Sequence, residues 1–310
     1  MTGNVTQQSQ TNAGEIDLRE LFTVIWRGKW VIVAVTGIFA VASVFYSLSL
    51  PNIYKAEALL APAAEQQSSS VGGQLGGLAA LAGVNIGGAR EIDKTTLAIQ
   101  IMQSRDFISR FIQKHEVLVP LFAVKEWQAE NNELIVNTDV YDVAQQIWLR
   151  EVEAPFKSKP SMEEAHKAFT AILDVSTDKE TGLVTISIEH QSPYIAKEWV
   201  YSLVRDINAE MRQRDASEAQ KSISYLSKQI NETSFSEVKA TLFSLIEEQT
   251  KTLMLTSVRD EYAFQTIDPA VVPELKFSPK RALIVVVATV LSGMLAVFSV
   301  LLISLFRKQG

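Results

Sequence analysis

Two long stretches without a charged residue, one near each end of the chain, constrain the fold most. Residues 31–50 read VIVAVTGIFAVASVFYSLSL, and residues 282–306 read ALIVVVATVLSGMLAVFSVLLISLF. A helix needs about 20 apolar residues to cross the hydrocarbon core of a bilayer. Both stretches meet that length, so we predict two transmembrane helices. The competing interpretations are a signal peptide for the first stretch and a buried core helix for the second. Pro51 follows the first stretch where a signal peptide would have a small-residue cleavage site.

Two spans divide the chain into five parts and place both termini on one side of the membrane. We expect a polar arm and a short interfacial helix in residues 1–30, with the helix at 15–26, and the first span in residues 31–50. Residues 51–281 then form the water-soluble domain, residues 282–306 the second span, and residues 307–310 a short tail.

The charges next to the spans favour cytoplasmic termini. Arg27 and Lys29 precede the first span, and Arg307 and Lys308 follow the second. Positive residues concentrate on the cytoplasmic side of membrane proteins. Lys280 and Arg281, at the other end of the second span, oppose this orientation, so the rule gives a preference only.

Composition excludes several kinds of site. The net charge of −6 argues against nucleic-acid binding, which needs a concentrated basic face. The chain has no cysteine, which excludes disulfides, a thiol nucleophile and a thiolate metal site. The three histidines, His115, His166 and His190, are far apart in sequence, and we expect no metal or cofactor.

A glycine-rich segment follows the first span. Residues 71–88 contain seven glycines but neither a phosphate-loop motif nor a dinucleotide fingerprint. We therefore expect a flexible loop rather than a nucleotide site. Its apolar middle suggests packing against another surface, such as a neighbouring subunit.

The soluble domain begins as a mixture of helices and strands. Residues 54–61 have the composition of a strand, and residues 93–119 look helical. Ser161 and Glu164 have the spacing of a capping box that opens a helix. Residues 171–176 and 183–189 are expected to be strands, and the alternation in the second indicates one buried face.

A long helical region follows, because residues 194–268 contain neither glycine nor proline. Ser192 and Pro193 form a good helix start, and we place long helices at about 193–256. Forty helical residues would extend about 60 Å, which is more than a compact domain of this size can contain. The helical spacing weakens at residues 231–236, and Ser234 to Glu237 has a second capping-box pattern. We therefore expect a turn there and a returning helix, with one unbroken helix as the alternative.

Three segments resemble one protein family. They are LRELFTVIWRGKWVI before the first span, PNIYKAEALLAP after it, and KTLMLTSVRDEYAFQTIDPAVVPELKFSPKRALI before the second. Together with the long helix they resemble the Wzz-type chain-length determinants, which are polysaccharide co-polymerases. The chain resembles the kinase-free class, because it lacks the phosphate loop of relatives with a fused tyrosine kinase.

The resemblance implies a fold class and a function. The implied fold is α+β and membrane-anchored: two transmembrane helices flank a periplasmic α/β base domain that carries a long projecting helical hairpin. The implied function is to set the chain length of O-antigen or a related surface polysaccharide in the bacterial inner membrane, without catalytic residues. The implied partners are copies of the chain in a ring, an inner-membrane polymerase, the nascent lipid-linked glycan and membrane lipid.

Other function classes have less support in the sequence. Acidic residues such as Glu151, Asp174 and Glu189 could form a glycosidase pair, but no motif fixes their geometry. A two-span receptor would need a cytoplasmic output domain. The remaining alternative is a membrane adaptor for capsule or exopolysaccharide export that works with a separate tyrosine kinase.

The residues that we expect to matter act in assembly rather than in chemistry. Pro269, Pro273 and Pro279 fix a stiff path from the last strand to the second span. Gly293 lies within that span, where a small residue permits close helix packing. Leu203 and Leu245 lie on the apolar stripes of the long helices.

Overall fold

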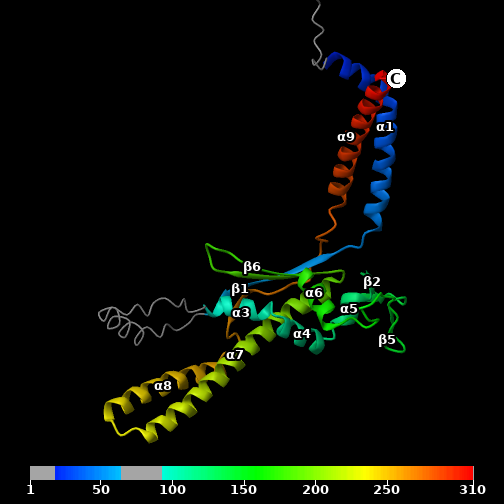
Figure 1. Cartoon of the computed structure of the whole chain (residues 1–310). Coiled ribbons are helices and arrows are strands. Elements are labelled where there is room, and N and C mark those ends of the chain that lie inside the picture. The colour runs from blue at the N-terminus through cyan, green and yellow to red at the C-terminus, as the bar shows by residue number, and fades with distance from the viewer. Residues whose placement is uncertain (1–17, 64–92, 310) are drawn as a thin grey trace, which may run out of the picture. The chain divides into compact units, whose positions relative to one another are not determined.

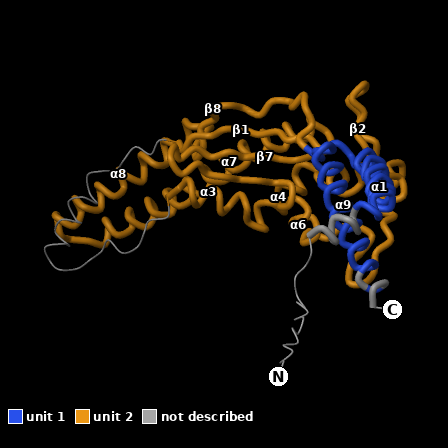
Figure 2. The backbone as a smooth tube through the Cα atoms, turned by 90° about the horizontal axis from the view of Figure 1, so that it is seen from above, with its two compact units in different colours: residues 1–52, 278–310 blue, residues 53–277 orange. Residues whose placement is uncertain are grey.

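The computed structural model describes residues 18–63 and 93–309, which form two compact units. The first unit joins the two ends of the chain, residues 1–52 and 278–310, and the second comprises residues 53–277 (Figure 2). The glycine-rich segment 71–88 lies outside the described residues.

The first unit is a pair of long apolar helices that lie side by side (Figure 1). Helix α1 spans Leu18–Ser49 and α9 spans Arg281–Gln309. Within them, Trp26–Ser49 and Arg281–Ser304 are long and apolar enough to cross a membrane. Only 6% and 11% of these windows is buried, so the apolar side chains face outward and the second helix is not a buried core helix. Helix α1 has no break between residues 18 and 49, so within that range the expected interfacial helix is continuous with the span.

The second unit is built on a four-stranded antiparallel sheet with the order β6-β7-β1-β8. Its strands are β1 (Tyr54–Pro62), β6 (Leu173–Thr177), β7 (Val184–His190) and β8 (Phe264–Asp268). In the register, Ala56, Ala58 and Leu60 of β1 lie opposite Ile188, Ile186 and Val184 of β7. All six are buried, so this alternation places the core on one face of the sheet, as the spacing in β7 predicts.

Helices cover the buried face of the sheet (Figure 1). These are α3 (Lys94–Met102), α4 (Arg105–Lys114), α5 (Leu118–Phe122), α6 (Met162–Ile172) and the first part of α7 (Pro193–Glu232). Between α5 and α6 lie two small antiparallel pairs that the sequence did not indicate: β2 (Val124–Gln128) with β3 (Glu133–Val136), and β4 (Tyr141–Asp142) with β5 (Ile147–Trp148).

The long helical region forms a hairpin. Helix α7 ends at Glu232, three residues connect it to α8 (Ser236–Val258), and α8 packs back along α7. The expected turn at residues 231–236 is confirmed, and the alternative of one unbroken helix is wrong. The predicted start of α7 is also confirmed, because the Ser192 hydroxyl accepts a hydrogen bond from the amide of Ile195 and Pro193 is the first helical residue.

Three local predictions need correction. The helical region expected at 93–119 is interrupted: α3 ends at Met102, the Ser104 hydroxyl caps α4, and α5 begins only at Leu118. The strand expected at 171–176 begins at Leu173, since α6 continues to Ile172 after the capping box of Ser161 and Glu164, which is present as predicted. The second capping box is absent: Phe235 is the N-cap of α8 and no side chain caps that helix.

Candidate functional site

Helices α7 and α8 form a hairpin, and only the first half of α7 packs against the sheet of the second unit. Ten of the eleven buried residues of α7 lie between Pro193 and Met211, and only Ala219 is buried beyond them. Thr256 is the one buried residue of α8. The first half of α7 is therefore part of the core, and beyond Met211 the helix is supported mainly by α8.

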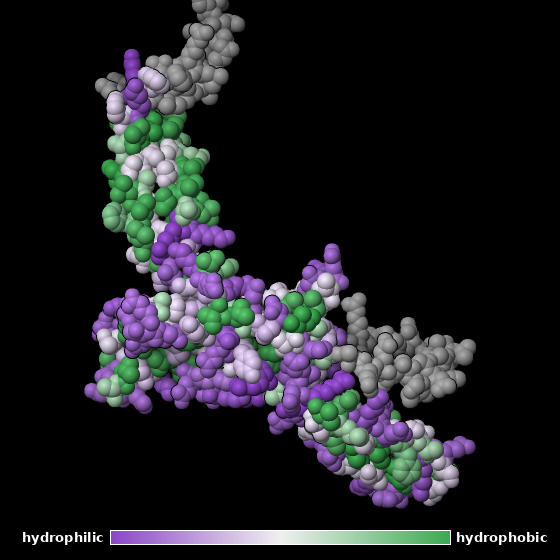
Figure 3. Space-filling view, turned by 180° about the vertical axis from the view of Figure 1, so that it is seen from behind, coloured by the Kyte–Doolittle hydropathy of each residue, from purple (hydrophilic) through white to green (hydrophobic). Residues whose placement is uncertain are grey.

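The exposed part of the hairpin presents large apolar side chains. Tyr225, Phe235, Val238, Phe243, Met254 and Val258 are all between 46% and 82% exposed. Figure 3 shows apolar residues spread among polar ones over this region. So many exposed large apolar side chains on one hairpin suit an interaction surface.

Leu203 and Leu245 have different environments. Leu203 is completely buried and belongs to the core beneath the sheet. Leu245 is half-buried on α8. The sequence placed both on apolar stripes of one helical region, but only Leu203 packs in the core.

A buried amide joins α7 to the last strand, and sequence reasoning missed it. The Asn208 side-chain oxygen accepts hydrogen bonds from the amides of Ala263 and Phe264, at 2.7 and 2.8 Å, and its nitrogen donates to the Phe264 carbonyl at 3.0 Å. Asn208 is 4% exposed. Buried polar groups need partners, so this residue fixes where β8 starts relative to α7. The available sequence signal for this role was that a polar residue, Asn208, lies among the apolar residues of the predicted helix.

A second set of polar contacts holds the strand where it leaves the hairpin. The Tyr262 hydroxyl donates to Asp215 at 2.7 Å, and the ammonium of Lys94 lies 3.4 Å from the same carboxylate. Arg212 and Asp260 are 2.9 Å apart. These contacts lie where α7 leaves the core and α8 ends, so they brace the base of the hairpin.

Charged residues of α4 and the turn after it meet α7 around Asp206. Its carboxylate contacts the Lys114 ammonium and the His115 imidazole, each at 2.8 Å. Burial opposes ionisation of Asp206, but the hydrogen bonds from Lys114 and His115 outweigh burial and lower its pKa. The Asp206 carboxylate is therefore a structural anion that ties α4 to α7.

His190 lies just before α7, and two backbone groups fix the orientation of its ring. Its Nδ1 accepts a hydrogen bond from the Ser192 amide at 2.9 Å, and its Nε2 lies 2.9 Å from the Pro120 carbonyl oxygen. These partners fit the neutral ring that carries its proton on Nε2. Burial lowers the pKa of His190 and favours this neutral form.

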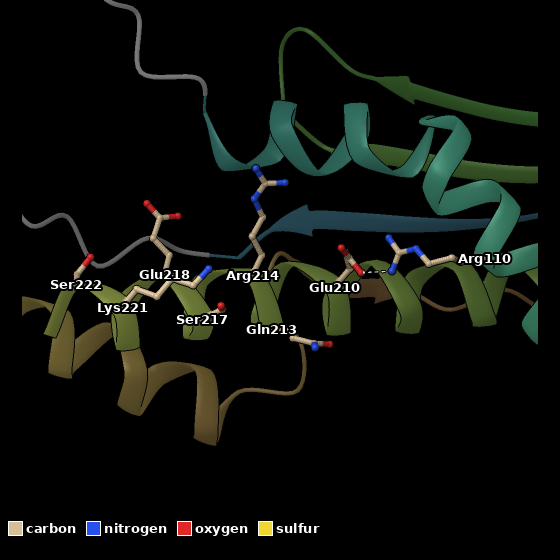
Figure 4. Close-up of a pocket in the computed structure, with 8 residues that line it drawn as sticks. All are labelled: Arg110, Glu210, Gln213, Arg214, Ser217, Glu218, Lys221 and Ser222. Carbon is tan, nitrogen blue, oxygen red and sulfur yellow. Dashed lines mark hydrogen bonds and ion pairs between the residues drawn. The ribbon is translucent and has the colours of Figure 1, made fainter. Parts of the chain in front are cut away.

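A polar hollow of about 540 Å³ lies along α7 beyond these contacts (Figure 4). Arg110 donates to Glu210 at one end, at 2.7 Å, and Arg214, Glu218 and Lys221 continue along α7. In Figure 4, Arg110 comes from α4 and the other side chains come from α7, and they do not converge on a common point. Within residues 18–63 and 93–309, no group of three His, Cys, Asp or Glu side chains is placed to hold a metal ion. The hollow shows no nucleophile–base arrangement.

The three prolines lie between β8 and α9. Pro269 is exposed and directly follows β8, and Pro273 is half-buried further along. In the second unit this segment is tied back to β1, because the Phe277 amide donates to the Ile53 carbonyl at 2.8 Å. Pro279 belongs to the first unit, and its carbonyl accepts from the amide of Arg281 at 2.9 Å.

In the helix pair, Gly293 faces α1, and the space beside it would accept a Cβ atom at ordinary van der Waals distance. A Cβ atom built on Gly293 would lie 3.7 Å from the Thr36 hydroxyl. Ser292 and Ala296 beside it are buried, so small residues do line this contact. The closest approach is at Gly28, where an added Cβ would lie 2.5 Å from Val300. Sequence reasoning missed Gly28, which precedes the predicted span.

Comparison with known proteins finds one family model that matches about the first third of the chain. Residues 14–115 match the family described as "Wzz: Chain length determinant protein". The resemblance inferred from the sequence is therefore confirmed over the first span, β1 and the helices that follow. No curated protein sequence matches the chain.

Two solved structures match the chain at low similarity. One is described as "full-length bacterial polysaccharide co-polymerase"; it is 14% identical, with 94% of this chain and 99% of that chain covered and a TM-score of 0.39. The other is described as "Fragment of WzzB, Polysaccharide Co-polymerase from Salmonella Typhimurium"; it is 12% identical, with 73% and 100% covered and a TM-score of 0.30. Both scores are low, so the functional argument rests on the family match.

Proposed function

We propose that this chain regulates the chain length of a bacterial surface polysaccharide, O-antigen or a related glycan, as a non-catalytic co-polymerase of the inner membrane. The observation that carries the proposal is the match of residues 14–115 to the chain length determinant family. The two apolar helices at the ends of the chain support membrane insertion. The chain would work beside the polymerase that extends a lipid-linked glycan.

The topology that fits this function has both termini in the cytoplasm and the second unit in the periplasm. Exposed Trp26 and Trp30 at the start of the first span suit a membrane interface, and Arg27 and Lys29 beside them suit the cytoplasmic side. A phosphatase fused after residue 310 tests this orientation. Phosphatase activity at that position would contradict it, because the enzyme is active only in the periplasm.

Assembly into a homo-oligomer would cover the exposed hairpin. The apolar residues between Tyr225 and Val258 have no place in the core of their own chain, and a neighbouring copy offers the matching surface. Crosslinking of the full chain in membranes tests this idea. A chain that stays monomeric in membranes and in several mild detergents would contradict it.

The function would depend on shape rather than on an acid, a base or a metal ligand. We expect a helix-breaking proline placed near Leu245, or replacement of Pro273 and Pro279 by alanine, to shift or erase the modal glycan length while the protein still accumulates. A proline near Leu203 should also erase it, but it would disrupt the core, so it does not separate shape from folding. Alanine replacements of single exposed carboxylates such as Glu151 and Asp174 are the matched controls, and they should leave the length profile intact. One carboxylate whose loss abolished length control without affecting assembly would contradict the non-catalytic proposal.

A deletion strain gives the decisive experiment. Lipopolysaccharide from the strain, separated on a gel, should lose its cluster of preferred lengths and show a ladder that declines steadily. Re-expression of the full chain should restore the cluster. Loss of capsule with an unchanged lipopolysaccharide profile would instead favour the export adaptor that works with a separate kinase.

A further inference from the structure

A groove between α1 and α9 has features that the proposed function does not use. It lies at the end of the helix pair where α1 finishes and α9 begins, and has a volume of about 360 Å³. Its walls are apolar: Val44 and Leu48 come from α1, and Val285 and Val286 come from α9. Arg281 lies at its edge, in the first turn of α9.

Two residues that line this groove carry a hydrogen-bond donor that has no partner among the described residues. The Ser47 hydroxyl is buried, at 1% exposure of the residue, and makes no hydrogen bond. Ser43, one turn earlier on the same helix, donates to the Ala40 carbonyl at 2.7 Å. The Nε of Arg281 is likewise buried and unpartnered. A buried donor without a partner is costly, so an acceptor from outside the chain would stabilise both groups.

The charge of Arg281 is also uncompensated within the described residues. Its terminal nitrogen donates to the Leu50 carbonyl and to the Asn52 side-chain oxygen, each at 3.1 Å, and both acceptors are neutral. Neither of these contacts, made among residues 18–63 and 93–309, is to a carboxylate. The edge of the groove therefore carries a positive charge on a fork-shaped group that suits phosphate.

We propose that this groove binds an anionic phospholipid of the surrounding bilayer. The lipid phosphate lies against the Arg281 guanidinium at the edge of the groove, and one acyl chain lies along Val44, Leu48, Val285 and Val286. Arg281 Nε and the Ser47 hydroxyl are covered in this structure, so they donate hydrogen bonds to the phosphate after a small side-chain rearrangement that opens them to the groove. A phosphate group has acceptors only and a negative charge, which complements two unpartnered donors and an unpaired cation. The apolar walls complement an acyl chain rather than a free phosphate ion. The inference rests on the proposed membrane insertion of α1 and α9.

The alternative to a specific site is an arginine that interacts with lipid headgroups in general. A long basic side chain near a helix end is stabilised simply by reaching the headgroup layer, and it needs neither a groove nor a serine. Lys280 is the internal comparison, because it is adjacent, exposed and outside the groove. A specific site makes Arg281 and Ser47 matter and leaves Lys280 without effect.

The test is native mass spectrometry of the full chain, stripped of lipid in detergent and then mixed with a defined lipid. The probes are dioleoyl phosphatidylglycerol, and dioleoylglycerol, which has the same tails and no phosphate. We expect the first to be retained and the second to be lost. Arg281→Gln should weaken retention roughly tenfold or more, because hydrogen bonds to charged groups are the strong ones. Lys280→Gln, the matched charge removal, should leave retention unchanged.

The groove itself is tested with Arg281 intact. Ser47→Ala should weaken retention of phosphatidylglycerol severalfold, whereas Ser43→Ala should not. Ala282→Trp fills the groove from its exposed side and should abolish retention. These variants decide the matter even if Arg281→Gln disturbs the contacts to Leu50 and Asn52.

Three results would overturn the proposal. Equal losses for Lys280→Gln and Arg281→Gln would mean attraction to the membrane surface without a site. Unchanged retention in Ser47→Ala and Ala282→Trp would mean that the groove is not the place of binding. Retention of a long-chain isoprenoid phosphate, with no retention of phosphatidylglycerol, would exclude a bilayer phospholipid as the occupant. Full helicity by circular dichroism confirms that each variant is folded.

Discussion

The two halves of α7 have the same helical backbone but different supports. From Pro193 to Met211 the helix packs in the core beneath the sheet, and Leu203 and Ile207 there are completely buried. From Arg212 to Glu232 only Ala219 is buried, and α8 is the neighbouring helix. The difference shows that helix length alone does not identify a core element. The first half packs in the core of its own chain, whereas most of the second half is exposed and available to a partner.

Removal of Leu203 should have the largest effect on this contrast. Leu203→Ala leaves a cavity in the core and should lower the free energy of unfolding by about 2–5 kcal/mol. Amide hydrogen exchange of the full chain in detergent measures the effect, which should appear throughout residues 193–211. Unchanged exchange there would mean that this half of α7 does not depend on the core.

Removal of the Asn208 amide should have the next largest effect. Asn208→Ala leaves the buried amides of Ala263 and Phe264 without an acceptor, which should cost about 1–3 kcal/mol. Hydrogen exchange at these two amides should accelerate more than exchange in β6, which lies at the opposite edge of the sheet from β8. The control is Gln213→Ala, because Gln213 is an exposed amide on the same helix and its loss should leave exchange at both positions unchanged.

Lowering the pH should remove two separate contributions to the stability of the fold, one from His190 and one from Asp206. The lowered pKa of Asp206 stabilises the fold above its ordinary value of 3.8, and this contribution is lost as the pH falls below that value. The lowered pKa of His190 stabilises the fold above 6.5, and its contribution is lost as the pH falls from there. Asp206→Asn should therefore reduce the loss of stability below pH 3.8. The loss of stability between pH 6.5 and pH 3.8 should stay unchanged. Thermal melting of the full chain across this pH range measures both.

Removal of Leu245 from the exposed hairpin should have the smallest effect on stability. Because Leu245 is half-buried, Leu245→Ala should cost roughly 1 kcal/mol, less than a core truncation. The effect should be confined to hydrogen exchange of α8 and the outer half of α7. A cost as large as that of Leu203→Ala would erase the contrast between the two halves.

Much of the local structure followed from local chemistry. Ser192 with Pro193, and Ser161 with Glu164, open helices as expected, because a cap needs only residues within one turn. Alternation in β7 predicted its buried face correctly, since the pleat repeats every two residues. The capping pattern failed at Ser234, because Phe235 is the N-cap of α8, and the cap that Ser104 provides for α4 was not foreseen.

The candidate residues show where sequence reasoning stopped. Leu203 and Leu245 have equivalent positions in the apolar pattern, and the pattern did not reveal that only Leu203 is in the core. Asn208 was missed because its partners lie 55 and 56 residues later in the chain. Roles for Pro269, Pro273, Pro279 and Gly293 stay predictions.

The sequence by itself determined the two apolar helices, the main strands of the sheet, the hairpin turn and the resemblance to the chain length determinant family. Each of these depends on composition or on spacing within a few turns, which a linear pattern records. Only the tertiary structure decided that α7 is half core and half exposed, that Asn208 holds β8, and that Ser47 and Arg281 line one groove. These features join residues far apart in the chain, and a contact of that kind is fixed by packing rather than by local preference.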